Sequence, residues 1–186
     1  MELHQHDQPA PSAWVRRFAR LIEPGGRVLD LACGPGRHAR HLAGLGYRVD
    51  AVDRDSAALA ALAGVAAVKT RCADLEGAPW PYAADRFEGI VVANYLHRPL
   101  VPALLESLRP GGVLIYETFA LGNEKLGRPS NPEFLLRPGE LLEWVAGRLH
   151  VLAFEQGLVE QPKPAVIQRI CAVQGRVEDC RLDLAS

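Results

Sequence analysis

Short apolar runs and stretches of helical periodicity follow one another along most of the chain. The run over 27–32 is short, strongly apolar and bounded by glycine, which is typical of a strand buried on both faces. The apolar runs predict strands over 27–32, 47–53, 65–72, 87–94, 113–119, 149–157 and 165–174. Between most of them apolar residues recur at helical spacing, which predicts helices over 13–23, 37–46, 56–64, 100–112 and 138–147.

This order of elements predicts an α/β fold. Strands that alternate with helices form a doubly wound, mostly parallel sheet of the Rossmann-like type, here with seven strands. No helix separates the last two strands, so we expect them to form an antiparallel hairpin at one edge. Residues 1–11 predict a flexible tail and residues 12–186 a single domain. Ser12 should cap the first helix, and Pro138 should open the last one.

Composition narrows the class of protein. The 186 residues are 48% apolar and 23% charged, as in globular proteins, and the formal net charge is −1. A near-neutral chain is not drawn to nucleic acid, and no apolar run is long enough to span a membrane. Four cysteines without a paired spacing indicate reduced thiols, and the N-terminus lacks the features of a secretory signal. We therefore expect a cytoplasmic protein, and the preference for arginine and alanine suggests a bacterial one.

A glycine-rich turn follows the first strand, in the segment LDLACGPGRHA over 29–39. Gly34 and Gly36 carry no side chains, so backbone groups can approach a ligand closely. The helix that begins near Arg37 points its positive end to the same place. In a doubly wound sheet, ligands bind beside such a turn, beyond the carboxyl ends of the strands. The spacing G-x-G-x-x-A also occurs in dinucleotide-binding turns, which leaves an NAD-dependent oxidoreductase as an alternative.

Carboxylates stand at the ends of three successive strands. Asp30 would repel a pyrophosphate but suits a cation, such as a ligand with a sulfonium and an α-amino group. Asp53 ends the second strand and can accept hydrogen bonds from ribose hydroxyls. Asp74 follows the third strand and can accept from an adenine amino group. Together the three acids outline S-adenosylmethionine.

The segment VLDLACGPGRHARHLAGLGYRVDAVDRD resembles the nucleotide-binding half of the class I S-adenosylmethionine-dependent methyltransferases. The chain's small size is similar to that of the tellurite-resistance-type methyltransferases. The resemblance implies that the backbone from Ala32 to Gly36 receives the methionine end of the cofactor. It also implies that the residues after the fourth strand, ANYLHR, flank the donor methyl group. The candidate cofactor-binding residues are thus Asp30, Ala32, Gly34, Gly36, Asp53, Arg54, Asp74, Leu75 and Asn94.

The resemblance implies methyl transfer by in-line displacement. A small-molecule acceptor is favoured because there is no added domain and no basic surface. An anionic acceptor needs no general base, whereas a neutral hydroxyl or amine could be assisted by His97, Tyr95 or Glu117. Arg98 is also expected to face the transferred methyl group. The long connection over 120–141 suggests a loop that covers the acceptor side and selects the substrate.

Other interpretations remain beside this one. The NAD-dependent oxidoreductase is weakened by Asp30, and a non-catalytic S-adenosylmethionine-binding regulatory module is the second alternative. His4 and His6 have no further ligands at useful spacing, so no metal site is expected. Four residues of the first crossover helix are interpreted as a solvated face: Arg37, His38, Arg40 and His41. The sequence leaves the oligomeric state and the acceptor open.

Overall fold

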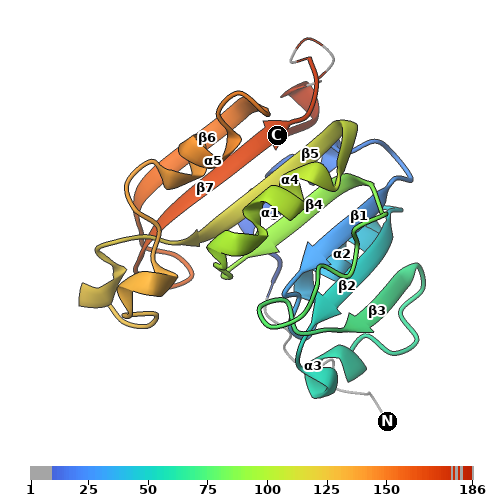
Figure 1. The fold of residues 1–186 in the computed structure, drawn as a ribbon, viewed down its shortest axis with the longest axis horizontal. Helices are drawn as coiled ribbons and strands as arrows, with labels where there is room; N and C mark the ends of the chain where they lie inside the picture. The colour runs from blue at the N-terminus through green and yellow to red at the C-terminus, as the bar shows by residue number, and fades with distance from the viewer. Residues whose placement is uncertain (1–9, 177, 179, 181, 186) are drawn as a thin grey trace.

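The computed structural model describes residues 10–176, 178, 180 and 182–185 and contains a seven-stranded sheet with helices on both faces (Figure 1). The strand order is β3-β2-β1-β4-β5-β7-β6. In chain order the strands are β1 Arg27–Leu31, β2 Arg48–Asp53, β3 Val68–Cys72, β4 Phe87–Ala93, β5 Leu108–Phe119, β6 His150–Val159 and β7 Ala165–Val173. The predicted α/β architecture is confirmed.

The directions of the strands place the ends of five strands at one edge of the sheet. Strands β1 to β5 pair in parallel, so their carboxyl ends meet at one edge of the sheet. Strand β7 runs antiparallel to both β5 and β6, and β6 lies at the outer edge. The predicted C-terminal hairpin is therefore confirmed. The Gly34 turn follows β1, next to the point where the strand order reverses direction, as expected for a doubly wound sheet.

The helices are shorter than their sequence patterns predict. The α-helices are α1 Ala13–Phe18, α2 Arg37–Gly44, α3 Ser56–Ala60, α4 Val101–Glu106 and α5 Glu140–Val145. The 3₁₀ turns are η1 Ala19–Leu21, η2 Arg98–Leu100, η3 Asn123–Lys125, η4 Pro132–Phe134 and η6 Leu182–Ala185. None of the helices described is long and apolar enough to cross a bilayer.

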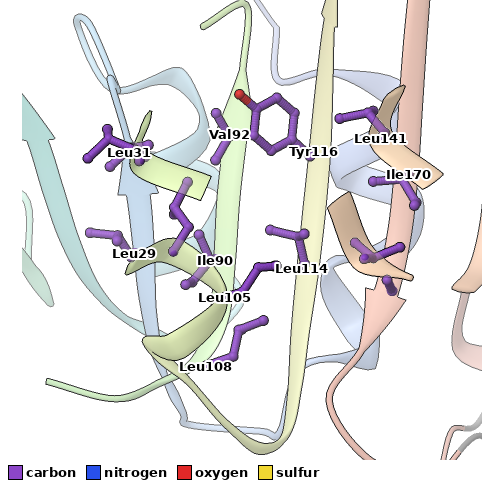
Figure 2. Close-up of a cluster of buried hydrophobic side chains, with 14 of the residues drawn as sticks. Leu29, Leu31, Ile90, Val92, Leu105, Leu108, Leu114, Tyr116, Leu141 and Ile170 are labelled. Atoms are coloured by element: carbon purple, nitrogen blue, oxygen red, sulfur yellow. The ribbon is translucent and has the colours of Figure 1, made fainter. Parts of the chain in front are cut away.

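Successive strand residues point to opposite faces of the sheet, and their side chains pack into two hydrophobic cores, one on each face. Side chains from β1, β4, β5 and β7 pack with α4 and α5 on one face, as Figure 2 shows for Leu29, Ile90, Leu114 and Ile170. The intervening residues pack with α1, α2 and α3 on the other face. Asp30 lies between Leu29 and Leu31 and therefore points to the α2 face, where it is buried.

The segment over 108–112 is extended rather than helical, which corrects the prediction of a helix reaching residue 112. Helix α4 ends at Glu106, and β5 begins two residues later. Neighbouring strands supply the backbone partners here, because the Gln174 N–H donates to the Gly112 carbonyl at 2.8 Å. Gly112 is required at this close approach, since a Cβ there would lie 2.9 Å from the Phe87 carbonyl oxygen. Tertiary pairing has overridden the local helical pattern.

The last helix begins later than predicted. Gly139 is the N-cap of α5 and has a left-handed backbone with φ +72°, so the helix cannot include Pro138. The Gly139 N–H instead donates to the Gln156 side chain on β6 at 2.8 Å. Pro138 therefore precedes the cap and is not the first helical residue.

Helix α1 is fastened to the sheet and to α2. The Ser12 side chain accepts from the N–H groups of Trp14 and Val15, which confirms the predicted N-cap. The Trp14 indole donates to the Ile170 carbonyl at 3.1 Å. The Ser12 N–H donates to His38 Nε2 at 3.2 Å. His38 is only 3% exposed, so its interpretation as part of a solvated face is wrong.

We expect His38 to make the protein acid-sensitive. Burial, with repulsion from Arg37 and His41, lowers the pKa of His38 to about 3 from its usual 6.5. Between pH 6.5 and pH 3, His38 therefore binds a proton in the unfolded chain but not in the folded protein. The contribution of neutral His38 to stability is fully present above pH 6.5 and is lost as the pH falls toward 3. One pKa unit corresponds to about 1.4 kcal/mol, so the free energy of unfolding should fall by a few kcal/mol.

Urea denaturation between pH 7 and pH 4 measures this loss. His38→Gln keeps an acceptor near the position of Nε2 without a titrating ring and should flatten the pH dependence. His150→Gln removes an exposed histidine on β6 and serves as the control, with an unchanged slope. An unchanged slope in His38→Gln would show that the acid sensitivity has another source.

Candidate functional site

The turn after β1 is a compact, glycine-rich loop at the edge of the sheet. Ala32, Gly34 and Gly36 all have positive φ angles, of 51°, 54° and 83°. A Cβ at Gly34 would meet no atom within 4 Å, so this side of the turn is open to a ligand. A Cβ at Gly36 would lie 2.4 Å from the Leu62 side chain, so a larger residue does not fit there. Gly36 is also the N-cap of α2.

Asp53 holds the glycine turn as well as facing the cavity. Its Oδ2 accepts from the Gly34 N–H at 2.8 Å, and its Oδ1 accepts from the Asp55 N–H at 2.9 Å. A carboxylate has about four acceptor positions, so two remain for a ligand. Asp55 caps α3 by accepting from the N–H groups of Ala57 and Ala58. The capping role therefore belongs to Asp55, and Asp53 is left to the turn and the cavity.

Asp30 lies beneath the turn rather than on a cavity wall. It is 1% exposed, and its Oδ2 has no hydrogen-bond partner among the residues that the structure describes. Burial raises the pKa of Asp30 to about 7, although the Ala39 backbone amide and the Arg37 charge oppose this shift. A buried carboxylate without a full set of partners is costly unless a cation or donor approaches it.

A cavity of about 220 Å³ lies at the carboxyl ends of β1, β2 and β3. Its walls contain five of the predicted residues, together with Ala73, Glu76 and Tyr95. Those five are Ala32, Asp53, Arg54, Asp74 and Leu75. The N–H groups of Glu76 and Gly77 lower the pKa of Asp74, which is exposed and so stays ionised. Sequence reasoning missed Glu76, whose place in the same short loop as Asp74 was the available signal.

Tyr95 lies between this cavity and the next. Its hydroxyl is buried without a hydrogen-bond partner in the described part of the chain. Burial raises the pKa of Tyr95, and the negative charges of Glu76 and Asp74 add to the effect. The phenol therefore stays protonated at neutral pH and can donate a hydrogen bond. It is a poor general base.

Two further cavities continue the first along the edge of the sheet. One of about 230 Å³ shares Glu76 and Tyr95 with the first cavity. The other, of about 530 Å³, shares Asn94, Thr118 and Phe119 with the second. Because neighbouring cavities share wall residues, the three cavities form a continuous row, and Asn94 and Tyr95 lie at its centre.

The structure separates the predicted catalytic residues. Glu117 lines the 530 Å³ cavity, and Tyr95 lines the two smaller ones. His97 is half-buried before η2 and lines none of these three cavities. Arg98 is also turned away, because it forms a 2.6 Å ion pair with Glu140. Arg98 thus lines none of these three cavities, and its guanidinium, which the sequence suggested for the donor side, is engaged by Glu140.

The loop over 120–141 uses its polar side chains internally. The Asn123 side chain donates to the Pro129 carbonyl and accepts from the Val166 N–H, and it is buried. Asn131 caps η4 by accepting from the Glu133 N–H. Pro129 and Phe134 reach the wall of the 230 Å³ cavity. Polar groups that the sequence offers to a substrate thus hold the loop together.

Residues 28–112 match the model of a family described as a methyltransferase domain. The match includes the glycine turn and all three acids of the site. This part of the chain is therefore similar to a methyltransferase domain. The class I methyltransferases, which the sequence resembles, use S-adenosylmethionine. For that cofactor this chain has an open turn at Gly34, two free acceptor positions on Asp53 and the unpartnered Asp30 oxygen. The residues present therefore fit that cofactor.

One sequence relative and several solved structures are similar to this chain. The chain is 34% identical over 130 residues to the protein-L-isoaspartate O-methyltransferase of Chlorobaculum tepidum, which covers 64% of the chain and 57% of that relative. TehB from Haemophilus influenzae superposes with a TM-score of 0.75 at 20% identity, over 91% of the chain and 64% of TehB. The N-methyltransferase NodS from Bradyrhizobium japonicum gives 0.67 at 15% identity, over 86% and 93%. The chain thus spans less than two thirds of the first two.

Arg37 is a second functional candidate that sequence reasoning missed. The sequence suggested a solvated face for the run Arg37, His38, Arg40 and His41, yet Arg37 lines the 530 Å³ cavity together with Asn94 and Glu117. Its position as the first residue of α2, directly after Gly36, was the available signal. Among the described residues, no group of three or more histidine, cysteine or acidic side chains gathers as a metal site, and His4 and His6 lie outside them.

Proposed function

We propose that this protein transfers a methyl group from S-adenosylmethionine to a small-molecule acceptor. The proposal is carried by one juxtaposition, in which the open turn at Gly34 lies between the buried Asp30 carboxylate and Asp53. A cationic amino-acid tail fits against such a turn, whereas a pyrophosphate does not fit beside two carboxylates. This favours methyl transfer over the dinucleotide alternative.

The nine predicted cofactor-binding residues take separate roles in this proposal. Asp53 accepts from the ribose hydroxyls, Asp74 accepts from the adenine amino group, and Leu75 and Arg54 cover the base. The backbone of Ala32, Gly34 and Gly36 receives the methionine tail, with Asp30 below it and Arg37 near its carboxylate. Asn94 lies beyond the methionine tail of the cofactor, at the centre of the row of cavities.

Alignment is the chain's main contribution to the reaction. When bound, S-adenosylmethionine supplies a methyl group on a positively charged sulfur, which keeps the electrons of the broken bond while the acceptor's lone pair forms the new one. Holding two reactants in line can contribute roughly 7–11 kcal/mol at the upper end. Asn94 and Tyr95 are placed to do so, because they lie where the three cavities adjoin.

Glu117 is the remaining candidate for proton removal. It lines the largest cavity, whereas His97 lines none of the three and the raised pKa of Tyr95 keeps its proton in place. An acceptor that is already anionic at its reacting atom would need no base. Glu117→Gln therefore separates the two cases through the pH dependence of the rate.

Calorimetric titration with S-adenosylhomocysteine and with NADH tests the cofactor. We expect micromolar binding of the first and none of the second. Transfer of a labelled methyl group from S-adenosylmethionine to any member of a panel of small acceptors then tests the enzyme. Binding without transfer to a panel that includes amines, thiols, phenols and carboxylates would favour the non-catalytic regulatory module.

The affinity for S-adenosylhomocysteine should rise with pH because of Asp30. Because its pKa is about 7, half of the Asp30 carboxyl groups in the free protein are protonated at pH 7. The ligand's ammonium group favours the ionised carboxylate. Affinity should therefore increase up to about tenfold between pH 6 and pH 8. Asp30→Asn should remove the dependence, and Asp55→Asn, two residues beyond Asp53, should keep it. A flat profile in the wild type would remove Asp30 from the binding site.

A further inference from the structure

The largest cavity lies on the α1 face of the sheet, beyond the glycine turn. Its floor is formed by side chains of three neighbouring strands that share one face: Glu117 and Phe119 from β5, Ala165, Ile167 and Arg169 from β7, and Val159 from β6. Its walls come from residues 10–13, from the turn over 161–163 and from Arg37. A volume of about 530 Å³ is within the usual range for a small organic ligand.

The charges around this cavity are unbalanced. Its lining contains three cations and one acid, which is Glu117. Arg169 is already neutralised, because its guanidinium donates to Glu155 at 2.8 Å. Arg37 and Lys163 have no ion-pair partner among the residues that the structure describes. In the proposed function Arg37 faces the carboxylate of the cofactor, so Lys163 is the cation that is left to pair with an anionic group on a second ligand.

The two free cations lie at different ends of the sheet order. Arg37 begins α2 beside the glycine turn, whereas Lys163 belongs to the β6–β7 turn at the outer edge. Neighbouring strands lie about 4.8 Å apart, so the three spacings from β4 to β6 correspond to about 14 Å. Asn94 follows β4 and marks the near end, and Phe119, Ile167 and Val159 form an apolar floor between the ends.

We propose, resting on the methyl transfer proposed above, that this cavity binds the acceptor and that the acceptor is an organic anion. Its nucleophilic atom lies near Asn94, its apolar body lies on Phe119, Ile167 and Val159, and its anionic group pairs with Lys163. Arg37 is left for the carboxylate of the cofactor. This assigns the acceptor to the edge hairpin and not to the loop over 120–141, where the Asn123 and Asn131 side chains bond within the chain.

Three probes with one apolar body and different head groups test the proposal: 4-phenylbutyrate, 4-phenylbutylamine and 4-phenylbutan-1-ol. Dissociation constants are measured by ligand-observed NMR on the full chain, with and without saturating S-adenosylhomocysteine. We expect the carboxylate to bind at least about tenfold more tightly than the amine. Equal affinity, or a preference for the amine, would overturn the proposal.

Two variants locate the binding. Lys163→Met should weaken 4-phenylbutyrate about fivefold and leave the alcohol unchanged, whereas Lys69→Met, on the exposed part of β3, should change neither. Val159→Trp fills the floor at the edge strand and should abolish binding of the carboxylate and the alcohol. Unchanged affinity for the carboxylate in Lys163→Met refutes the anion pairing even if Val159→Trp fails to fold. Loss of binding in Phe134→Ala, with Val159→Trp unaffected, would assign the probes to the 230 Å³ cavity instead.

Titration of the same variants with S-adenosylhomocysteine separates this proposal from the one it rests on. Both Lys163→Met and Val159→Trp should bind it as the wild type does. If the wild type binds S-adenosylhomocysteine but shows no preference for the anionic probe, only the acceptor proposal is wrong. If the wild type does not bind S-adenosylhomocysteine at all, the proposed function itself is wrong.

Discussion

Asp53→Ala is expected to weaken the binding of S-adenosylhomocysteine by about 100-fold or more. In the proposed binding mode the substitution removes two hydrogen bonds to the ribose, and each bond to a charged group contributes about 1.5–3 kcal/mol. It also releases the Gly34 N–H, which donates to Asp53 Oδ2 at 2.8 Å and helps to hold the turn in place. Calorimetric titration of the purified variant measures the loss directly.

Asp55→Ala is the matched control for this substitution. Asp55 lies two residues further along the chain and caps α3, so its loss should cost about 1 kcal/mol of stability. Its side chain does not line the cavity that holds Asp53. S-adenosylhomocysteine should therefore bind it with an affinity close to that of the wild type. A loss of less than threefold in Asp53→Ala would remove the ribose role from this residue.

Arg98→Ala is expected to reduce the free energy of unfolding by about 3 kcal/mol or more. Its partner Glu140 is fully buried, and without Arg98 that carboxylate keeps only the Arg137 backbone N–H and the exposed Arg137 side chain as partners. Arg98 also donates to the carbonyls of Glu133 and Leu135, so the substitution frees the segment that includes Phe134. Urea denaturation measures the stability.

Arg137→Ala provides the comparison for the same carboxylate. Arg137 lies 3.4 Å from Glu140 but is 62% exposed, so its loss should cost no more than about 1 kcal/mol. The two arginines together hold the pKa of Glu140 below its usual value, against the effect of burial. Equal and small losses in both variants would show that Glu140 is better solvated than its burial indicates.

Arg98 also bears on the acceptor side of the site. The residues that it holds include the part of the loop that lines the 230 Å³ cavity. Arg98 is therefore a positioning residue for that wall and does not touch the reacting atoms. If the acceptor binds in the larger cavity, as we propose, Arg98→Ala should lower stability more than it changes the binding of the anionic probe.

The local pattern of apolar and polar residues predicted most of the architecture, because the periodicity of strands and helices depends on residues that are close in the sequence. The runs over 27–32 and 87–94 are mostly apolar, as is typical of strands covered on both faces, and both form strands at the centre of the sheet. The absence of a helix between the last two strands was sufficient to predict their antiparallel pairing. The predicted pattern was wrong at 108–112, where backbone partners from distant strands decide the conformation.

The sequence by itself determined the sheet and indicated a site beside the glycine turn, because both depend on short-range features: periodicity, and the spacing of glycines and acids around strand ends. Only the tertiary structure decided how individual charged side chains are used. Arg98 is paired with Glu140, 42 residues away, and Arg37 and Lys163 come to one cavity from distant parts of the chain. The physical reason is that burial and ion pairing depend on which distant segments meet, and no local pattern records that.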